Sequence, residues 1–181
     1  MFLFISPFAI QTNESINLSI NVNFVNYPFD KVMAIQSFNR RKKMDTKQIE
    51  LVQASFEKVR PIADQAAELF YTRLFEIAPH YRHMFKNDMK KQGAMLMSTL
   101  GLAVGSLNDL EKILPAVRAL GQRHAGYGVT AEHYQPVAEA FLWTLEQAFG
   151  EAFTPELKEA WVIAYTTLAG VMIEASEAVP A

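Results

Sequence analysis

Residues 119–129, ALGQRHAGYGV, place one histidine at the end of an apolar helical pattern and follow it with two glycines. Steps of three and four residues put four side chains on one face of a predicted helix over residues 110–124, namely Ile113, Val117, Leu120 and His124. Gly126 and Gly128 then favour a sharp exit of the chain. The pattern predicts that the imidazole of His124 points inward, beside three aliphatic side chains.

An imidazole in such surroundings has two interpretations, because burying it without a partner is costly. His124 could be a core histidine whose ring is satisfied by one backbone carbonyl, which is the commoner case for a periodic pattern alone. It could also be a metal ligand. The carbonyl of Leu120, one turn earlier, can accept a hydrogen bond from one ring nitrogen and leave the other nitrogen to bind a metal.

The sequence favours one kind of metal site over another. A single histidine cannot close a tetrahedral zinc site, and the chain has no cysteine. His80, His83 and His133 lie elsewhere, without acidic residues at a ligand spacing. A macrocycle that supplies four nitrogens needs only one protein ligand and an apolar slot. An inward histidine in a helical domain therefore suits haem better than zinc.

Composition narrows the class of protein. The chain has 181 residues, of which 50% are hydrophobic and 20% charged, enough for one soluble domain with a substantial core. A formal net charge of -2 lacks the basic surplus that nucleic-acid binding needs. No apolar run is long enough to span a bilayer. The absence of cysteine is compatible with reducing conditions, and we expect a cytoplasmic protein.

The first 43 residues differ from the rest. A strand-like alternation covers Ile16, Leu18, Ile20, Val22 and Phe24, and no second strand pattern of similar quality follows. The basic run RRKK at residues 40–43 marks a boundary, and Met44 opens a stretch that reads like a protein start. We expect residues 1–43 to be a flexible extension or the product of a mis-assigned start, and residues 44–181 to form the domain.

Helical periodicity continues through the whole of that domain. The sequence predicts helices over residues 45–59, 61–77, 89–105, 110–124, 130–149 and 155–176, with a short turn ending near residue 85. Gly93 and Ala67 are small enough to let two of these helices cross closely. The predicted fold class is all-α, with six to eight helices and short connections.

Three stretches carry a resemblance to a known family: LFYTRLFEIAPHYRHMF at residues 69–85, NDLEKILPAVRALGQRHAGYGVTAEHY at 108–134 and AWVIAYTTLAGVM at 160–172. From Met44 to about Ser176 the chain resembles the bacterial single-domain haemoglobins and the haem domains of flavohaemoglobins. This resemblance implies the globin fold around a pocket for haem b, iron protoporphyrin IX.

The resemblance also implies roles for particular residues. Those that would contact the cofactor are Phe85, Leu96, Leu120, His124 and Val129, with His124 as the iron ligand. Those with catalytic roles would be Tyr71 and Gln92 on the distal side, where an external ligand binds, and Tyr134 on the proximal side. Without the resemblance, Tyr71 and Phe85 would be ordinary core residues and Gln92 a solvated helix residue.

One part of the family pattern is incomplete. In flavohaemoglobins the tyrosine at the position of Tyr134 joins a glutamate of the last helix, and together they orient the proximal histidine and increase its donor strength. The aligned place falls at about Ser176, between Glu174 and Glu177, and neither glutamate is a clear equivalent. The sequence therefore does not predict a complete anionic proximal network.

The function implied first is reversible binding of O2 with high affinity, for transport or storage. The alternatives are nitric oxide dioxygenation with a separate reductase, because these 181 residues contain no flavohaemoglobin reductase domains, or gas sensing through a partner. Haem-free globin-like domains would lack the proximal histidine, which His124 supplies. We expect a monomer or a homodimer.

Overall fold

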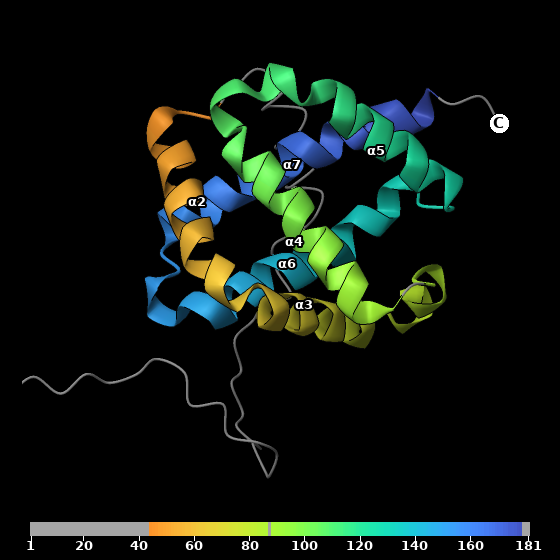
Figure 1. Ribbon diagram of the computed structural model, residues 1–181, viewed down its shortest axis with the longest axis horizontal. Coiled ribbons are helices and arrows are strands. Elements are labelled where there is room, and N and C mark those ends of the chain that lie inside the picture. Colours follow the sequence, from red (N-terminus) through yellow and green to blue (C-terminus); the bar gives the residue numbers. More distant parts are fainter. Residues whose placement is uncertain (1–43, 87, 179–181) are drawn as a thin grey trace, which may run out of the picture.

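The computed structural model describes residues 44–86 and 88–178, and this part of the chain is all helical, which confirms the predicted fold class (Figure 1). The α-helices are α2 (Thr46–Val59), α3 (Ala63–Ile77), α4 (Met89–Gly105), α5 (Leu114–Gly126), α6 (Tyr134–Phe149) and α7 (Pro155–Glu177). They are joined by the 3-10 segments η2 (Arg60–Ile62), η3 (Pro79–Met84), η4 (Leu107–Lys112), η5 (Ala131–His133) and η6 (Gly150–Ala152). Within the described ranges, no helix is both long and apolar enough to cross a membrane.

Residues 1–43 lie outside the described part of the chain, so the alternating pattern between Ile16 and Phe24 and the proposed domain boundary remain predictions.

Local sequence signals set the starts of several helices. Asp45 caps α2 by accepting a hydrogen bond from the Gln48 amide at 2.8 Å, and the Gln48 side chain accepts one from the Asp45 amide at 3.1 Å. Thr154 caps α7 by accepting from the Leu157 amide at 3.3 Å. These contacts stay within one turn, which is why the predicted ends of these helices are close to the observed ones.

The helix predicted over residues 110–124 begins too early. The chain forms η4 up to Lys112, with a non-helical conformation at Asp109, and α5 starts only at Leu114. Pro115 explains the difference, because proline suits a first helical turn but would remove a hydrogen bond from a helix interior. At the other end α5 passes His124 and ends at Gly126, and the sharp exit follows at Gly128, where φ is 82°.

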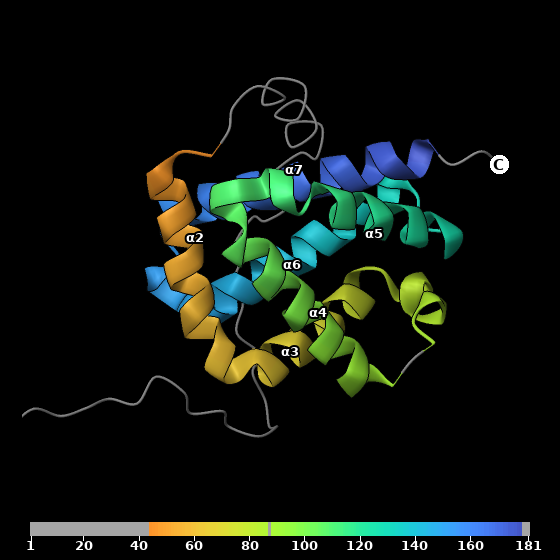
Figure 2. The ribbon, with the colours of Figure 1, turned by 45° about the horizontal axis from the view of Figure 1, so that its top comes forward.

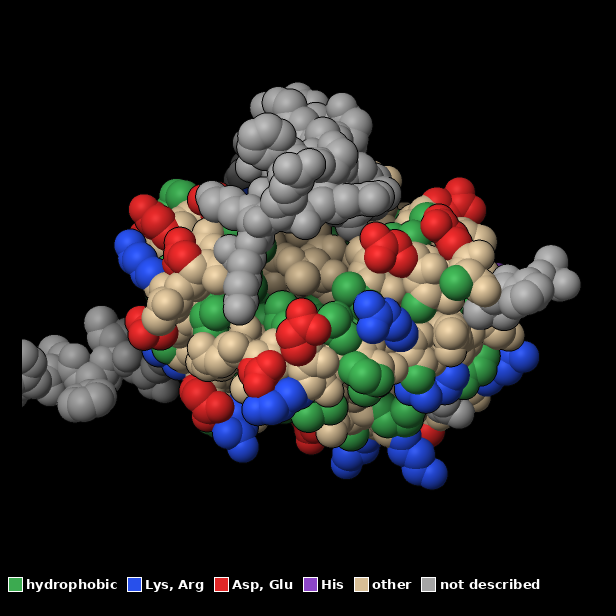
Figure 3. Space-filling view, turned by 90° about the horizontal axis from the view of Figure 1, so that it is seen from above, with side chains coloured by type: hydrophobic (Ala, Val, Ile, Leu, Met, Phe, Trp, Pro, Cys, Tyr) green, Lys and Arg blue, Asp and Glu red, His purple; other side chains and the backbone are tan. Residues whose placement is uncertain are grey.

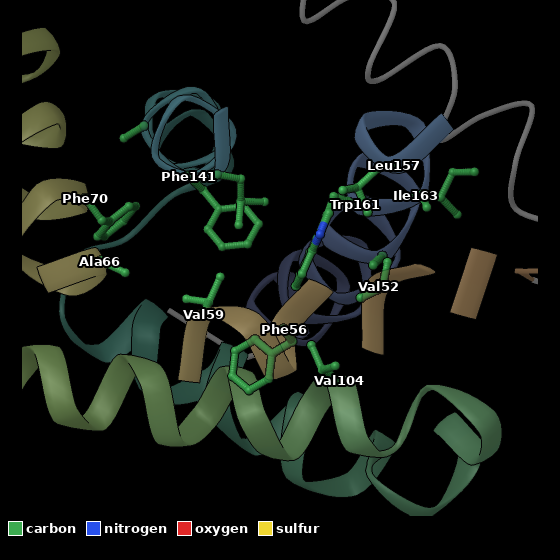
Figure 4. Close-up of a cluster of buried hydrophobic side chains, with 14 of the residues drawn as sticks. Val52, Phe56, Val59, Ala66, Phe70, Val104, Phe141, Leu157, Trp161 and Ile163 are labelled. Atoms are coloured by element: carbon green, nitrogen blue, oxygen red, sulfur yellow. The ribbon is translucent and has the colours of Figure 1, made fainter. Parts of the chain in front are cut away.

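The main core lies between α2, α3, α6 and α7. Figure 4 shows Phe70 and Phe141 approaching it from α3 and α6, and Trp161 from α7. The Phe141 and Trp161 rings are 5.3 Å apart, edge to face. The Trp161 indole donates a hydrogen bond to the Ser55 hydroxyl at 2.9 Å, so this buried polar pair is satisfied.

Helix packing separates α4 from α5. The contacts of α5 run mainly to α7, whereas α4 packs on α3 and α2. In Figure 2, α5 lies above the corner that α3 and η3 form. On the face seen in Figure 3, basic and acidic side chains are interspersed, in keeping with the small net charge of -2.

Gly121 allows the close approach of α5 to α7. A Cβ atom at this buried position would lie 2.7 Å from the Cα atom of Met172 and closer still to the Met172 carbonyl oxygen. Both atoms belong to the backbone of α7, which cannot move aside cheaply. The position of α5, and with it the position of His124, depends on this glycine.

We expect Gly121→Ala to lower the free energy of unfolding by about 1–3 kcal/mol, the usual cost of an inserted methyl group that has no space. The matched control is Gly126→Ala in the same helix, where no neighbour lies within 4 Å of the added atom. That change should be neutral or slightly stabilising, because alanine favours helix. Urea denaturation of both variants is the measurement, and equal stability would contradict the role of Gly121.

Candidate functional site

The distal residues Tyr71 and Gln92 meet where α3 crosses α4. A Cβ atom on Gly93 would lie 2.9 Å from the Cβ atom of Ala67, so the close crossing expected from these small residues is present. Gln92 precedes Gly93, and Tyr71 lies one turn after Ala67, so the crossing brings these two side chains within reach of each other. The Gln92 side chain is hydrogen-bonded to the Tyr71 hydroxyl. Two polar groups from different helices thus form one pair.

Aromatic rings surround the Tyr71 side chain, which is only 6% exposed. The centroids of Phe70, Phe85 and Phe75 lie 4.9, 5.5 and 6.0 Å from that of Tyr71. Burial raises the pKa of Tyr71 above its ordinary value, and the hydrogen bond to Gln92 offsets this only in part. The phenol therefore keeps its proton at neutral pH and remains a hydrogen-bond donor.

Phe85 and Leu96 belong to the same cluster. Phe85 follows η3 directly, and its ring lies 5.4 Å from Phe75, edge to face. Leu96 lies one turn after Gln92 on α4, and both it and Phe85 are partly buried against the core that contains Tyr71. The structure thus places Phe85 and Leu96, two of the predicted cofactor contacts, near the Tyr71–Gln92 pair.

His124 is held by its own helix. Its ring is partly buried, and Nδ1 donates a hydrogen bond to the Leu120 carbonyl at 2.9 Å, as expected from the sequence. We assign the tautomer from this bond, which leaves the Nε2 lone pair as a donor for a metal. Burial lowers the pKa of His124, the hydrogen bond to Leu120 opposes this, and the positive charge of Arg123 lowers it further. The imidazole is therefore neutral at pH 7, as a metal ligand must be.

Val129 is tied to the end of α5. Its amide donates a hydrogen bond to the His124 carbonyl at 3.0 Å, and its side chain packs against the buried cluster that contains Tyr134. Leu120, one turn before His124, is partly buried. These three positions of the sequence prediction, Leu120, His124 and Val129, thus lie along one continuous stretch of chain.

Tyr134 does not take part in a proximal network among the described residues. Its side chain is buried, yet its hydroxyl has no hydrogen-bond partner there. Glu174 and Glu177 are both exposed, and the Ser176 hydroxyl donates to the Ile173 carbonyl of its own helix. The incomplete family pattern at Ser176 thus coincides with an unpartnered tyrosine hydroxyl.

We expect Tyr134→Phe to leave the free energy of unfolding unchanged or to raise it by up to ~1 kcal/mol, because an unpaired buried hydroxyl costs desolvation energy. Tyr165→Phe is the matched control, since the Tyr165 hydroxyl donates a 2.7 Å hydrogen bond to the Tyr134 carbonyl. That variant should lose about 1 kcal/mol. Thermal or urea denaturation compares them, and an equal loss in both would mean that the Tyr134 hydroxyl is paired.

Two contributors were not identified from the sequence. Phe75 stands one turn after Tyr71, so helical spacing could have indicated its contact. Tyr165 holds the Tyr134 carbonyl across 31 residues of chain, and no local pattern signals such a contact.

The donor set suits a metal that brings its own equatorial ligands. In the part of the chain that the structure describes, no three or more His, Cys, Asp and Glu residues are grouped so that they could hold a metal ion. The groups that remain for binding a cofactor are the neutral imidazole of His124, the polar side chains of Tyr71 and Gln92, and the aromatic and aliphatic residues near them. These residues fit a haem, which requires one axial protein ligand and apolar walls. The described part of the chain is therefore all-α, with a donor set compatible with a haem held by one histidine.

Comparison with known proteins supports the same class. Residues 68–172 match the globin family, and the chain belongs to that family. It is 29% identical over 133 residues to the flavohemoprotein of Bacillus subtilis, a match that covers 72% of this chain. The chain spans about one third of the length of that relative, 33%.

Two solved structures share the fold. One is a candidate nitric oxide dioxygenase from Rhodothermus marinus in a form engineered as a carbene transferase, with a TM-score of 0.68 and 26% identity. That match covers 74% of this chain and 94% of the other. The other is a globin from Campylobacter jejuni, with a TM-score of 0.65 and 21% identity, covering 74% and 96%. The second similarity concerns the fold alone.

Proposed function

We propose that this protein is a haem globin that binds dioxygen reversibly and with high affinity. Haem b, when bound, supplies four equatorial nitrogens and an iron with one position for a diatomic ligand. The observation that carries the proposal is the Tyr71–Gln92 pair, two joined polar side chains in aromatic surroundings, in a chain whose α5 carries a neutral histidine.

His124 would hold the iron through Nε2, and its hydrogen bond to Leu120 keeps the ring oriented. Phe85, Leu96, Leu120 and Val129 would lie against the macrocycle and exclude water. All four are partly buried, as expected of residues that complete their burial against a cofactor.

On the distal side, the Tyr71 hydroxyl and the Gln92 amide would donate hydrogen bonds to the ligand. A dioxygen bound there would carry partial negative charge, which would strengthen the hydrogen bonds from these two donors, whereas carbon monoxide would carry less charge and gain less. Slow release of dioxygen follows. On the proximal side, the Tyr134 hydroxyl has no partner among the described residues, which supports a neutral imidazole and thus reversible binding rather than peroxide-type activation.

Absorption spectra of the purified protein in its ferric, ferrous and oxygenated forms test this function. We expect a Soret band, and a ferrous protein that takes up dioxygen and releases it when the gas is removed. The absence of a Soret band after reconstitution with haemin would overturn the proposal.

Nitric oxide dioxygenation is the second candidate function, favoured by the flavohemoprotein relatives and the R. marinus structure. In this reaction dioxygen and nitric oxide give nitrate, and a separate reductase would return the iron to the ferrous state. Nitrate yield and steady turnover with a supplied reductase test it. If the oxygenated protein fails to consume nitric oxide, this function is eliminated. A sensor role would require a partner protein that responds to the ligand-bound state. The cytoplasmic location and the oligomeric state remain predictions from the sequence.

A further inference from the structure

An aromatic contact joins two short segments that flank the candidate site. The centroid of the Tyr81 ring, on η3, lies 4.5 Å from that of the His133 ring, on η5, and the two ring planes are inclined by 32°. Both side chains are partly buried. Aromatic pairs at this separation contribute to stability beyond the area that they bury. The contact therefore ties η3 to η5, although the two segments are far apart in the sequence.

The segment η3 belongs to the distal half of the candidate site. Phe85 follows its last residue, and the Phe85 ring lies 5.5 Å from that of Tyr71. Arg82 links η3 to the same aromatic cluster. Its guanidinium lies 5.1 Å from the centre of the Phe75 ring and donates a hydrogen bond to the Phe85 carbonyl at 3.1 Å. A displacement of η3 would therefore move Phe85.

The segment η5 belongs to the proximal half. It follows Val129 and Thr130, and the Val129 amide is the one that donates to the His124 carbonyl. Thr130 and His133 form a capping box. The Thr130 amide donates to Nδ1 of His133 at 3.0 Å, and the Thr130 hydroxyl accepts from the His133 amide. The capping box thus fixes the His133 ring on the short stretch of chain that follows His124.

We propose that Tyr81 and His133 are positioning residues that hold the two halves of the haem site together and so retain the cofactor. Their ring contact, the Tyr81–His133 clasp, connects the segment that ends at Phe85 with the segment that follows His124. The haem would leave by a local opening in which these segments separate, and a contact that bridges them raises the free energy of that opening. This inference rests on the proposed function and adds a determinant of cofactor retention to it.

The rate of haem loss tests the clasp. Tyr81→Ala removes the ring and should speed the transfer of ferric haem from the loaded protein to an excess of apomyoglobin by about fivefold, ~1 kcal/mol. Tyr81→Phe keeps the ring without the hydroxyl and should release haem at the rate of the unmodified protein. An unchanged rate in Tyr81→Ala, or an equal acceleration in both variants, would overturn the clasp.

A substitution at His133 separates the ring contact from the capping box. His133→Gln supplies the side-chain acceptor that a capping box ordinarily uses but has no ring, so it should accelerate haem loss about as much as Tyr81→Ala. In the double variant the two effects should not add, because each substitution removes the same contact. Fully additive effects would show that the two residues act independently and would contradict the clasp.

A second ring contact separates retention of haem from general stability. Phe149 and Phe153 flank η6, at the opposite end of the domain from η3 (Figure 1), and their partly buried rings lie 6.3 Å apart. Phe153→Ala should lower the urea midpoint of unfolding without a matching rise in the rate of haem loss under native conditions. If Phe153→Ala and Tyr81→Ala release haem equally fast, retention follows global stability and the clasp is wrong.

Failure of this inference is distinguishable from failure of the proposed function. A protein that has a Soret band and binds dioxygen, but whose haem loss is unchanged in Tyr81→Ala, would overturn the clasp alone. A protein without a Soret band after reconstitution with haemin would overturn the proposed function and, with it, this inference.

Discussion

The His124→Gly variant is expected to lose the Soret band after exposure to haemin, with its helical content intact. His124 is the residue on the described part of α5 that presents a neutral imidazole with Nδ1 already bonded to Leu120. The loss should exceed about 100-fold in haem affinity, because removing a mere outer-shell partner of a metal ligand costs about 10–100-fold. Haemin titration followed by absorption, with far-UV circular dichroism as the folding check, is the measurement.

Two controls sharpen this experiment. Free imidazole added to His124→Gly should restore a five- or six-coordinate spectrum, because it can occupy the space of the missing ring. His80→Ala, at an exposed position on η3, should bind haemin like the unmodified protein. Retention of the full spectrum in His124→Gly without imidazole would rule out this residue as the iron ligand.

Tyr71→Phe is expected to raise the dissociation rate of dioxygen by at least about tenfold, since one charge-assisted hydrogen bond is worth roughly 1.5–3 kcal/mol. The carbon monoxide dissociation rate should change less, because that ligand carries less charge. Stopped-flow displacement measures both rates. Tyr127→Phe, which removes a hydroxyl from a 70% exposed residue, is the matched control and should not alter either rate.

The hydrogen bond between Tyr71 and Gln92 predicts coupling between them. In a double-mutant cycle with Gln92→Leu, the two effects on dioxygen dissociation should be non-additive, because each side chain positions the other. An unchanged rate in Tyr71→Phe would show that this hydroxyl does not reach the ligand, and Gln92 would then be the remaining donor.

Sequence spacing predicted contacts within one helix better than contacts between two helices. The bond from His124 to Leu120 spans four residues, so α5 places the ring within reach of that carbonyl once the helix forms. The Tyr71–Gln92 contact joins two helices and was not predicted, whereas the assignment of both residues to the distal side depended on the family resemblance. The crossing at Gly93 supports it physically.

The early start predicted for α5 has a different cause. Periodicity extended the helix back to Leu110 because that side chain also fits the apolar face. Pro115 was the signal against it, since its position inside the predicted helix would have cost a hydrogen bond. In this case the sequence did contain a local signal, Pro115, but the apolar periodicity was given more weight.

The sequence by itself determined the all-helical class, most helix ends and the inward histidine, because caps, prolines and apolar steps act within a few residues of chain. Only the tertiary structure decided how closely α5 approaches α7 at Gly121, that the Tyr134 hydroxyl lacks a partner in the described residues, and that a small apolar cavity lies beside Leu96. Each of these depends on backbone and side chains from segments far apart in the chain, whose positions are set by packing of the whole domain rather than by local preference.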